Sequence, residues 1–224
     1  HQTYKKFEII IVYDSENNED YFKILEIEKK DKRIKIIKNN KNLGAGESRN
    51  KAIKFSNGSY IAFLDADDFW HKDKLKLQLK FMQFNNLSFS HTSYHIVDKN
   101  NKILGKRKAP LTISYNTLIK SCDIGLSTVL IKKKIIGKTK FPRLKTKEDY
   151  VFWLSISKKG FDIAGINRCL TGWRRLENSL SSSIFQKILD GYRVYRLYLK
   201  FSFFRSIFSL LILSSNYLKK EIKK

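Results

Sequence analysis

Cysteine, proline and glycine are scarce in this sequence, with two, two and ten residues respectively among 224. The two cysteines, Cys122 and Cys169, are too few for a disulfide framework, so we expect structural thiols in a reducing compartment. The low proline and glycine content excludes collagen-like and low-complexity chains. Since 42% of the residues are hydrophobic, the chain can bury a sizeable core. Its length suits one domain with a terminal extension.

Acidic residues are also in short supply: 21 Asp and Glu face 45 Lys and Arg, which leaves a formal net charge of +24. Such an excess favours a nucleic acid, an anionic membrane surface or an anionic substrate as partner. No RNA- or DNA-reading motif accompanies the charge, which argues against nucleic acid. Well-spread surface charge also needs no specific ligand, so composition alone leaves the partner open.

A hydrophobic run long enough to cross a membrane is missing as well. The charge-free stretch near the C-terminus, Ser206–Leu218, has thirteen residues, whereas about 20 are needed to span a bilayer. Basic residues flank it on both sides: Arg193, Arg196, Lys200, Arg205, Lys219 and Lys220. We therefore predict a globular domain at residues 1–183 and a basic amphipathic helical tail at residues 184–224. The tail lies either in a membrane interface or packed on the domain.

Apolar, β-branched runs alternate with helical patterns in the first third of the chain. Three buried strands and two intervening helices are predicted: strands at 7–13, 33–37 and 60–64, and helices over about 21–30 and 44–55. This alternation predicts an α/β fold with an open, mostly parallel sheet flanked by helices. Ligands of such sheets bind beyond the carboxyl ends of the strands. Asp14 follows the first strand and Asp65 follows the third, so both are expected at that edge.

The second half of the chain turns toward antiparallel pairing. A hairpin is predicted where two strand-like runs, 88–97 and 102–107, flank the turn residues Asp98–Asn101. The other predicted elements are a helix over 73–84, a strand over 126–131 and a helix over 147–160. Four lysines in or beside the first of these helices are expected to be solvated: Lys72, Lys74, Lys76 and Lys80.

Three carboxylates, Asp65, Asp67 and Asp68, cluster directly after the third predicted strand. Like charges at close range raise one another's pKa unless a positive group neutralises them. Mg²⁺ or Mn²⁺ does so with one or two carboxylates and takes its other ligands from water and substrate phosphates. The alternative is a helix N-terminus, where acidic residues cap the backbone and interact favourably with the helix dipole.

These acids belong to a longer segment, residues 40–75, which reads NKNLGAGESRNKAIKFSNGSYIAFLDADDFWHKDKL. The segment resembles the nucleotide-binding core of family 2 glycosyltransferases of the GT-A fold. The resemblance keeps the same order and spacing from Phe7, and it continues more loosely to about Ser181 through LSTVLI, KTKEDYVFWLSISKKG and WRRLENSLS. It implies a GT-A-like sheet and a catalytic domain at residues 1–183, of the type that builds bacterial surface polysaccharides.

The resemblance also implies roles for individual residues. Asp67 is similar to the acid that coordinates a divalent metal, Mn²⁺ or Mg²⁺, at the diphosphate of the donor. Five residues match positions near the base, the ribose or the diphosphate: Asp14, Arg49, Asp65, Arg174 and Arg175. Taken without the resemblance, Arg49 is also consistent with an ion pair on a helix surface, and the last two arginines with an exposed basic turn.

The pair Glu148-Asp149 resembles the ED motif of the family, whose second residue is the catalytic base. Asp149 would then take the proton of an acceptor hydroxyl in an inverting transfer. The implied donor is a nucleotide sugar, UDP-linked, and the implied acceptor is a surface polysaccharide or lipid-linked glycan at the cytoplasmic face of the membrane. The bare residues also fit a helix N-terminus, where acidic side chains are favourable.

The sequence departs from the family pattern in two places. Tyr13 and Ser15 replace the first Asp and the Gly of the usual DDGS motif. The first strand, loop and helix of the family precede the position of His1, so we expect roughly 30 residues, about one strand-helix unit, to be missing there. Two alternatives therefore stay open: a degenerate family member, and a non-catalytic basic module that binds an anionic membrane or nucleic acid.

Overall fold

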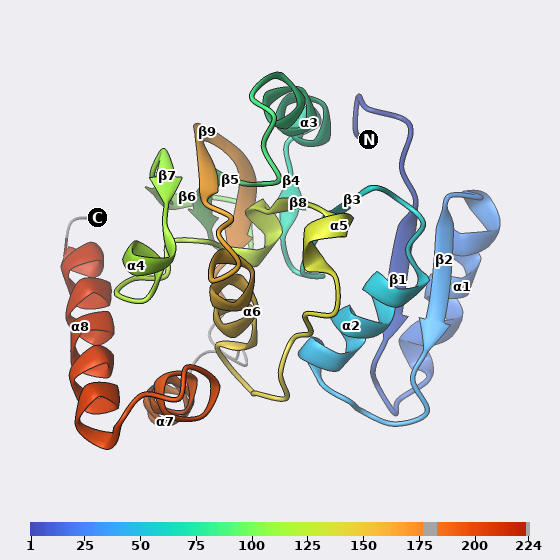
Figure 1. The fold of residues 1–224 in the computed structure, drawn as a ribbon. Helices are drawn as coiled ribbons and strands as arrows, with labels where there is room; N and C mark the ends of the chain where they lie inside the picture. Colours follow the sequence, from blue (N-terminus) through green and yellow to red (C-terminus); the bar gives the residue numbers. More distant parts are fainter. Residues whose placement is uncertain (177–182, 223–224) are drawn as a thin grey trace.

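A computed structural model describes residues 1–176 and 183–222 of the chain (Figure 1). Its first part is a β-α-β unit followed by a second helix. Strands β1 (Ile9–Tyr13) and β2 (Ile34–Lys38) pair in parallel, with Ile9 opposite Ile34. Helix α1 (Glu19–Lys30) joins them, and α2 (Ala45–Phe55) follows β2. The β-α-β unit predicted from the sequence is therefore confirmed.

A second, seven-stranded sheet forms the centre of the molecule. Along the sheet, neighbouring strands follow the order β3 (Tyr60–Ala62), β8 (Leu130–Lys132), β5 (Phe89–Val97), β9 (Ile163–Arg174) and β4 (Phe69–Trp70). In addition, β6 (Ile103–Arg107) pairs with β5, and β7 (Thr112–Ile113) pairs with β9. Strands β5 and β9 are parallel, and the other pairs described in this sheet are antiparallel. The α/β class is confirmed, with a more mixed sheet than predicted, because short turns such as the one after β5 permit only antiparallel neighbours.

The remaining described elements are mostly helical. Residues 126–128 form a 3₁₀ turn before β8, so the strand predicted over 126–131 begins later than expected. The helices are α3 (Lys74–Phe84), α4 (Tyr115–Leu118), α5 (Lys133–Ile136), α6 (Glu148–Ser157), α7 (Ile184–Arg193) and α8 (Phe203–Ile222), with a π-helical turn (Val194–Tyr198) after α7.

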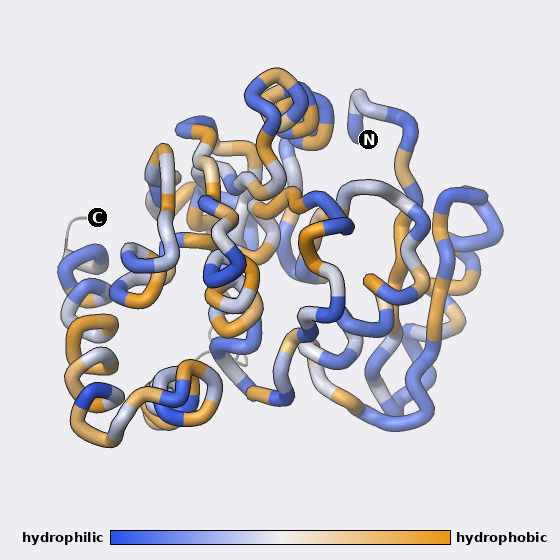
Figure 2. Tube along the Cα trace, in the orientation of Figure 1, coloured by the Kyte–Doolittle hydropathy of each residue, from blue (hydrophilic) through white to orange (hydrophobic). Residues whose placement is uncertain are grey.

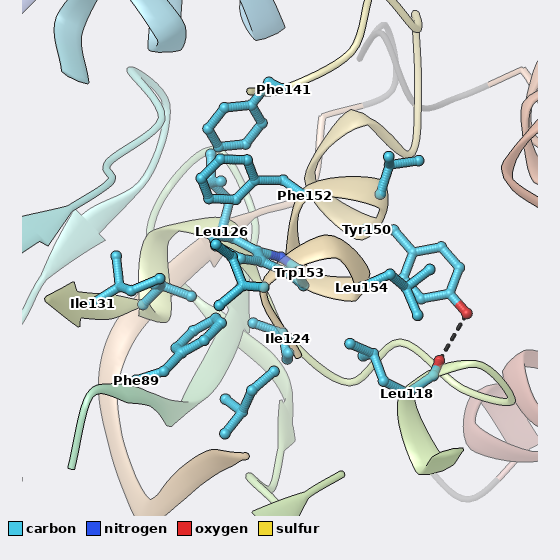
Figure 3. Close-up of a cluster of buried hydrophobic side chains, with 14 of the residues drawn as sticks. Phe89, Leu118, Ile124, Leu126, Ile131, Phe141, Tyr150, Phe152, Trp153 and Leu154 are labelled. Carbon is cyan, nitrogen blue, oxygen red and sulfur yellow. Dashed lines mark hydrogen bonds between the residues drawn. The ribbon is translucent and has the colours of Figure 1, made fainter. Parts of the chain in front are cut away.

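The core is built around α6, which is buried along almost its whole length (Figure 3). The rings of Phe141 and Phe152 stack with centroids 4.0 Å apart, and Trp153 lies 5.2 Å from Phe89 of the central sheet. Tyr150 donates its hydroxyl to the Leu118 carbonyl at 2.7 Å. Offset and edge-on aromatic pairs contribute beyond their buried area, so this cluster holds α6 firmly against the sheet.

The prediction that Lys74 is solvated is wrong. Its side chain is 0% exposed, with the ammonium 4.3 Å from the centre of the Trp70 ring and 2.9 Å from the Gln78 side-chain oxygen. Helix α3 therefore turns Lys74, Gln78 and Met82 inward at four-residue spacing. Burial lowers the pKa of Lys74 to about 7, because a low-dielectric interior disfavours the charged form.

The predicted helical tail forms α7, the π-helical turn and α8, and α8 lies at the edge of the molecule opposite β2 (Figure 1). Tyr195 and Leu213 enter the main hydrophobic cluster with exposures of 0% and 7%. Packing on the domain, one of the two alternatives for the tail, is therefore observed. Within residues 1–176 and 183–222, no helix has the length and apolar character required to cross a bilayer. The boundary at residues 183 and 184 stays a prediction.

Candidate active site

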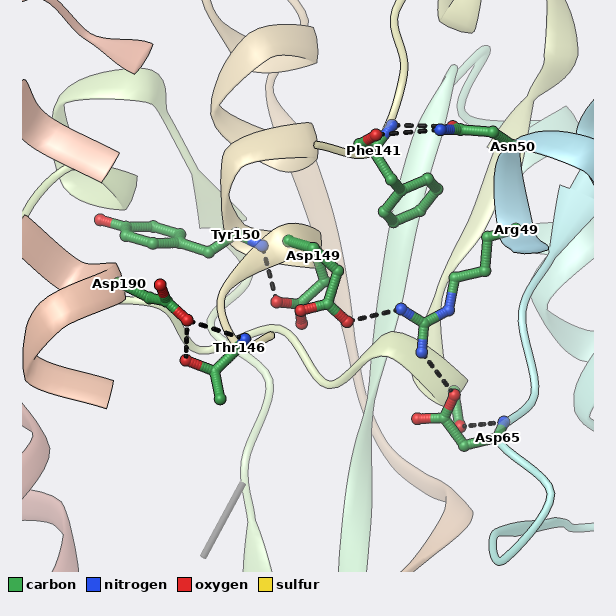
Figure 4. Close-up of polar contacts among 10 residues, drawn as sticks. Arg49, Asn50, Asp65, Phe141, Thr146, Asp149, Tyr150 and Asp190 are labelled. Atoms are coloured by element: carbon green, nitrogen blue, oxygen red, sulfur yellow. Dashed lines mark hydrogen bonds and ion pairs between the residues drawn. The ribbon is translucent and has the colours of Figure 1, made fainter. Parts of the chain in front are cut away.

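Arg49 on α2 joins two acidic segments that are far apart in the sequence (Figure 4). Its guanidinium lies 2.8 Å from the Asp65 carboxylate after β3 and 2.6 Å from the Glu148 carboxylate at the start of α6. The side chains of Arg49 and Glu148 are only 17% and 13% exposed. Burial alone would lower the pKa of Arg49, but the charges of Asp65 and Glu148 raise it. The two ion pairs thus keep this arginine charged while they hold the acidic segments together.

Asp149 lies beside this network in the first turn of α6. Its carboxylate accepts a hydrogen bond from the Tyr150 backbone N–H at 2.7 Å. Burial raises the pKa of Asp149, against the opposing charges of Arg49 and Lys147. Burial and the charge of Asp149 also raise the pKa of Glu148. A carboxylate that binds a proton more readily than usual is better suited to act as a base.

The loop between β3 and β4 is fixed by the turn before β8. Asp65 donates its backbone N–H to the Ser127 hydroxyl at 3.1 Å, and Trp70 donates its indole N–H to the Ser127 carbonyl at 2.7 Å. Asp68 donates its backbone N–H to the Asp65 carbonyl at 3.0 Å. These bonds hold the loop in a tight turn, which leaves Asp67 exposed at its tip.

The two oxygens of the Asp68 carboxylate differ in their hydrogen bonding. Oδ1 accepts the Arg174 backbone N–H at 2.9 Å, whereas the buried Oδ2 has no hydrogen-bond partner among the described residues. Burial raises the pKa of Asp68 to about 6, and the charges of Asp65 and Asp67 raise it as well. A buried, unpaired carboxylate oxygen beside two more acids is a position that a cation would stabilise.

The acidic loop fits Mg²⁺ or Mn²⁺ when a phosphorylated ligand supplies further oxygens. Within the described residues, no group of three or more His, Cys, Asp or Glu is arranged to hold a metal by itself. Such ions need only one or two carboxylates when phosphates and waters complete the shell. The exposed Asp67 could supply one oxygen, and the unpaired oxygen of Asp68 lies in the same turn. The residues present therefore suit a shared protein-substrate metal site.

Arg174 at the end of β9 fastens the same loop to the β5–β6 turn. Its guanidinium donates to the backbone carbonyls of Asp67, Asp98 and Lys99 at 2.8, 2.9 and 3.1 Å. It also donates to the Asn101 side chain at 2.9 Å. Four bonds to protein oxygens make Arg174 a clamp on the acidic loop. The next residue, Arg175, is exposed and donates its backbone N–H to Val97 at 2.9 Å.

Asp14 lies at the start of α2. Its carboxylate accepts the backbone N–H groups of Leu43 and Gly44 at 2.8 and 2.7 Å and the Asn39 side-chain amide at 2.7 Å. Asn39 also bonds Ser48, the residue before Arg49. Asp14 therefore fixes the entry to α2. A glycine is favoured at position 44 because the backbone there has φ 84°, a conformation that glycine adopts readily.

The structure brings the predicted residues together in three linked groups. In the first group, Arg49 contacts Asp65 directly and Asp149 lies beside them. In the second, the Arg174 guanidinium bonds the Asp67 carbonyl of the acidic loop. Asp14, at the start of α2, is the third. Arg175 lies next to Arg174 with its backbone bonded to β5. Residues 177–181, the end of the family-like WRRLENSLS segment, lie outside the described residues.

Sequence reasoning missed two residues that support the site. Ser127 anchors the acidic loop, but its segment was interpreted only as a strand. Asp190 of α7 is 0% exposed and accepts the Thr146 backbone N–H and hydroxyl at 3.0 and 3.1 Å, directly before Glu148 and Asp149. Asp190 is one of only two acids in an otherwise basic tail, with Glu221, and this contrast is the available signal.

Comparisons with known proteins agree on one family. The sequence model of Glycosyl transferase family 2 matches residues 1–148. The putative teichuronic acid biosynthesis glycosyltransferase TuaG of Bacillus subtilis is 35% identical over 222 residues, covering 99% of this chain and 88% of that protein. The UDP-Glc:alpha-D-GlcNAc-diphosphoundecaprenol beta-1,3-glucosyltransferase WfgD of Escherichia coli is 40% identical over 190 residues, covering 84% and 73%.

Solved structures support the fold. S. aureus TarS 1–349, crystallised with UDP-GlcNAc, superposes with a TM-score of 0.70 at 21% identity, over 88% of this chain and 58% of that chain. The mannosyltransferase PcManGT of Pyrobaculum calidifontis, in complex with GDP-Man and Mn²⁺, gives 0.65 at 12% identity, over 90% and 58%. This chain thus spans somewhat more than half of each solved chain. Together with the matched residues 1–148 and the two relatives, these likenesses establish that the chain has a GT-A-like α/β fold and belongs to glycosyl transferase family 2.

Proposed function

We propose that this protein transfers a sugar from a nucleotide-sugar donor, UDP-linked, to a hydroxyl of a surface polysaccharide or lipid-linked glycan. The names of the relatives support this choice. The name of WfgD gives a UDP-Glc donor and a diphosphoundecaprenol acceptor, and the name of TuaG gives teichuronic acid biosynthesis. A lipid-linked acceptor would place the protein at the cytoplasmic face of the membrane. Residues 1–183 would be the catalytic domain and residues 184–224 its tail.

One observation carries the proposal: Arg49 binds Asp65 and Glu148 at once. An acidic loop suited to a metal-bound diphosphate and a candidate base on α6 are therefore held at one place. A purely structural ion pair would need only one of the two carboxylates. This bridge instead connects the parts that a group transfer requires, namely a leaving-group site and a proton acceptor.

In the proposed reaction the acceptor oxygen attacks the anomeric carbon of the donor sugar while the nucleoside diphosphate leaves from the opposite face, so the configuration inverts. Asp149 would accept the hydroxyl proton, over a heavy-atom distance of about 2.6–3.2 Å or through one water. The raised pKa of Asp149 makes it a stronger base once it is deprotonated. A divalent cation held by Asp67, with Mn²⁺ or Mg²⁺ as candidates, would supply charge stabilisation at the leaving diphosphate.

The donor site is proposed to include Asp14, Arg49, Asp65, Arg174 and Arg175. Among these, Arg175 is exposed and available to an anionic ligand. Arg174 would contribute by fixing the acidic loop through its bonds to Asp67, Asp98 and Lys99. Asp14 would contribute by holding the Leu43–Gly44 segment. Arg49 would act mainly through Asp65, with which it forms an ion pair.

Substitution of the proposed base tests the reaction. Asp149→Asn in the full-length protein should abolish transfer while UDP-sugar binding, measured by calorimetry, is kept. Asp162→Asn is the matched control, because Asp162 is an exposed acid just beyond α6. Normal turnover by Asp149→Asn would refute the assignment of the base. Loss of donor binding in that variant would instead make Asp149 a binding residue.

Removal of the proposed metal ligand tests the donor site separately. Asp67→Ala should abolish the Mn²⁺-dependent part of UDP-sugar binding, with calorimetry run in Mn²⁺ and in EDTA. Asp20→Ala is the control, since Asp20 is an exposed acid of α1 whose carboxylate forms an ion pair with Lys23. An Mn²⁺-dependent gain in donor binding that persists in Asp67→Ala would refute the role of Asp67.

A further inference from the structure

Helix α8 turns small polar side chains toward the domain. Ser206 and Ser209 are 0% and 9% exposed on its inner side. The Asn216 amide donates to the Lys120 carbonyl at 3.0 Å, and the Lys220 ammonium contacts Asp123. A helix that simply covers a soluble core places its apolar stripe inward and its polar stripe outward. The inner side of α8 is instead mixed, because these polar residues share it with the buried Leu213.

The outer side of α8 is a stripe of large apolar residues. Phe204, Phe208, Leu211 and Leu218 are 82%, 65%, 62% and 59% exposed. Their spacing of four, three and seven residues keeps them on one side of the helix. Figure 2 shows the apolar colour along α8 at the edge of the molecule. An exposed apolar stripe of this kind marks a surface that a partner covers.

The charges around the stripe are predominantly basic, with the acid Glu221 following its C-terminal end. The sequence from residue 191 to residue 220 contains no Asp or Glu. Arg196, Lys200, Arg205 and Lys219 are exposed at the two ends of the stripe. The nearest acid before it, Asp190, is buried and bonded to Thr146. A partner that fits this face must therefore combine an apolar interior with a negatively charged rim.

A groove beside the stripe also combines basic and apolar side chains. Its volume is about 210 Å³, and its lining includes Lys120, Phe201, Arg205, Phe208 and Ile212. Two cations stand next to apolar walls in this groove. An acidic lipid has this same combination, because a charged headgroup is joined to an acyl chain.

We infer that the outer face of α8 docks on an anionic lipid bilayer, with the helix in the plane of the interface and Phe204, Phe208 and Leu211 at the acyl boundary. This inference rests on the membrane location proposed above and names the surface responsible. A second copy of this chain is a poorer occupant, because a symmetric interface would bring the cations of two α8 helices together. Lysines and arginines near an anionic membrane each strengthen binding.

Flotation with lipid vesicles, without donor or metal, tests this surface. The full chain should bind vesicles that contain phosphatidylglycerol and should bind pure phosphatidylcholine much more weakly. The triple variant Phe204→Ser, Phe208→Ser, Leu211→Ser should lose at least about tenfold in vesicle affinity, since each large apolar side chain contributes on insertion. Phe84→Ser is the matched control, because Phe84 is 86% exposed on α3.

A charge variant isolates the electrostatic part. Lys200→Gln with Lys219→Gln should weaken binding to phosphatidylglycerol vesicles by up to about fivefold for each lysine, the equivalent of about 1 kcal/mol. Lys32→Gln with Lys41→Gln is the control pair, since both lysines are exposed in the β1–α2 part of the chain. High salt should reduce the difference between the two pairs.

Three results would overturn the inference: no binding of the full chain to phosphatidylglycerol vesicles, unchanged binding by a triple variant with native circular dichroism, or dimers in light scattering that only the triple variant disrupts. Donor binding separates this inference from the proposed function. The triple variant should bind UDP-sugar with Mn²⁺ as before, and Asp67→Ala should still bind vesicles. Loss of vesicle binding with donor binding intact supports the surface even if transfer is never observed.

Discussion

Helices α6 and α8 lie against the same core, but α6 buries mainly apolar residues whereas the inner side of α8 combines Ser206 and Ser209 with Leu213. In α6 the residues Tyr150, Phe152 and Trp153 are all 0% exposed, whereas α8 buries Ser206 and exposes Phe204. Aromatic packing holds α6 in one position, which suits a helix that begins with two carboxylates of the candidate site. Polar contacts near its C-terminal end help to hold α8, so its apolar side remains available for a partner. The two helices show that apolar content alone does not reveal whether a helix serves the core or the surface.

The largest effect expected from this contrast is on stability. Trp153→Ala should lower the free energy of unfolding by about 3–5 kcal/mol, because it removes the centre of the aromatic cluster and leaves a cavity. Phe208→Ala should change it by no more than about 0.5 kcal/mol, since the side chain is 65% exposed. Urea unfolding monitored by circular dichroism measures both. Equal losses would mean that α8 also depends on its outer residues for folding.

Asp190 of α7 joins the tail to the rest of the domain, because it bonds the segment before α6. Asp190→Ala should lower stability by about 2–3 kcal/mol, since it leaves the buried Thr146 N–H and hydroxyl unsatisfied. It should also lower kcat with little change in the donor KM, because it loosens the segment that carries the proposed base.

Asp190→Asn offers the comparison, since its side-chain oxygen can still accept from Thr146. We expect this variant to recover most of kcat. A kcat that stays normal in Asp190→Ala, despite the lost stability, would show that α7 supports the fold without positioning the base.

Lys74 on α3 is a fully buried ionisable side chain on an inward face. Its pKa in the folded protein is about 7, below the ordinary value of 10.5. Between these values the unfolded chain binds the proton that the folded one lacks, so stability rises with pH over this window. Lys74→Met removes that dependence.

The gain from Lys74→Met should therefore be largest at pH 6 and smaller by about 2–3 kcal/mol at pH 9, at roughly 1.4 kcal/mol per pH unit above 7. Thermal unfolding at the two pH values measures it. Lys76→Met on the exposed side of α3 is the control and should show no such change. A pH-independent gain would indicate that the Lys74 ammonium finds compensation from the Trp70 ring and Gln78 in its charged form.

Local patterns were enough to predict much of the fold. The β-α-β unit, the β5–β6 hairpin and α6 follow from runs of apolar residues and turn signals that lie within a few residues of one another. The candidate site was also accessible, because Asp65 and Glu148 each lie at the boundary of such an element. The pairing of β3 with β8 was not, since it joins residues about 70 positions apart and depends on which strands the connections bring together.

Which side chains are buried was the other feature that could not be predicted from the sequence. Helical spacing places Leu75 and Leu79 on an apolar face, but the inward positions belong to Lys74 and Gln78. Trp70 covers the lysine and the Gln78 side-chain oxygen accepts a hydrogen bond from its ammonium, and neither contact can be inferred from the period of the helix. The same holds for Ser206 of α8, where the orientation is decided by what the helix docks against.

The smallest expected effect concerns the proton affinity of the proposed base at the start of α6. Burial raises the pKa of Asp149, and Lys147 is one of the charges that lower it. A base acts only when deprotonated, so kcat should fall as the pH drops through this raised pKa. Lys147→Gln removes a stabilising charge, which should move the acidic limb of the kcat profile to higher pH, with Lys145→Gln as the exposed control. The rate should change by less than about tenfold, because a partly exposed charge pair contributes about 1 kcal/mol or less. A limb that moves to lower pH would contradict Asp149 as the titrating base, since loss of a nearby cation can only favour its protonated form.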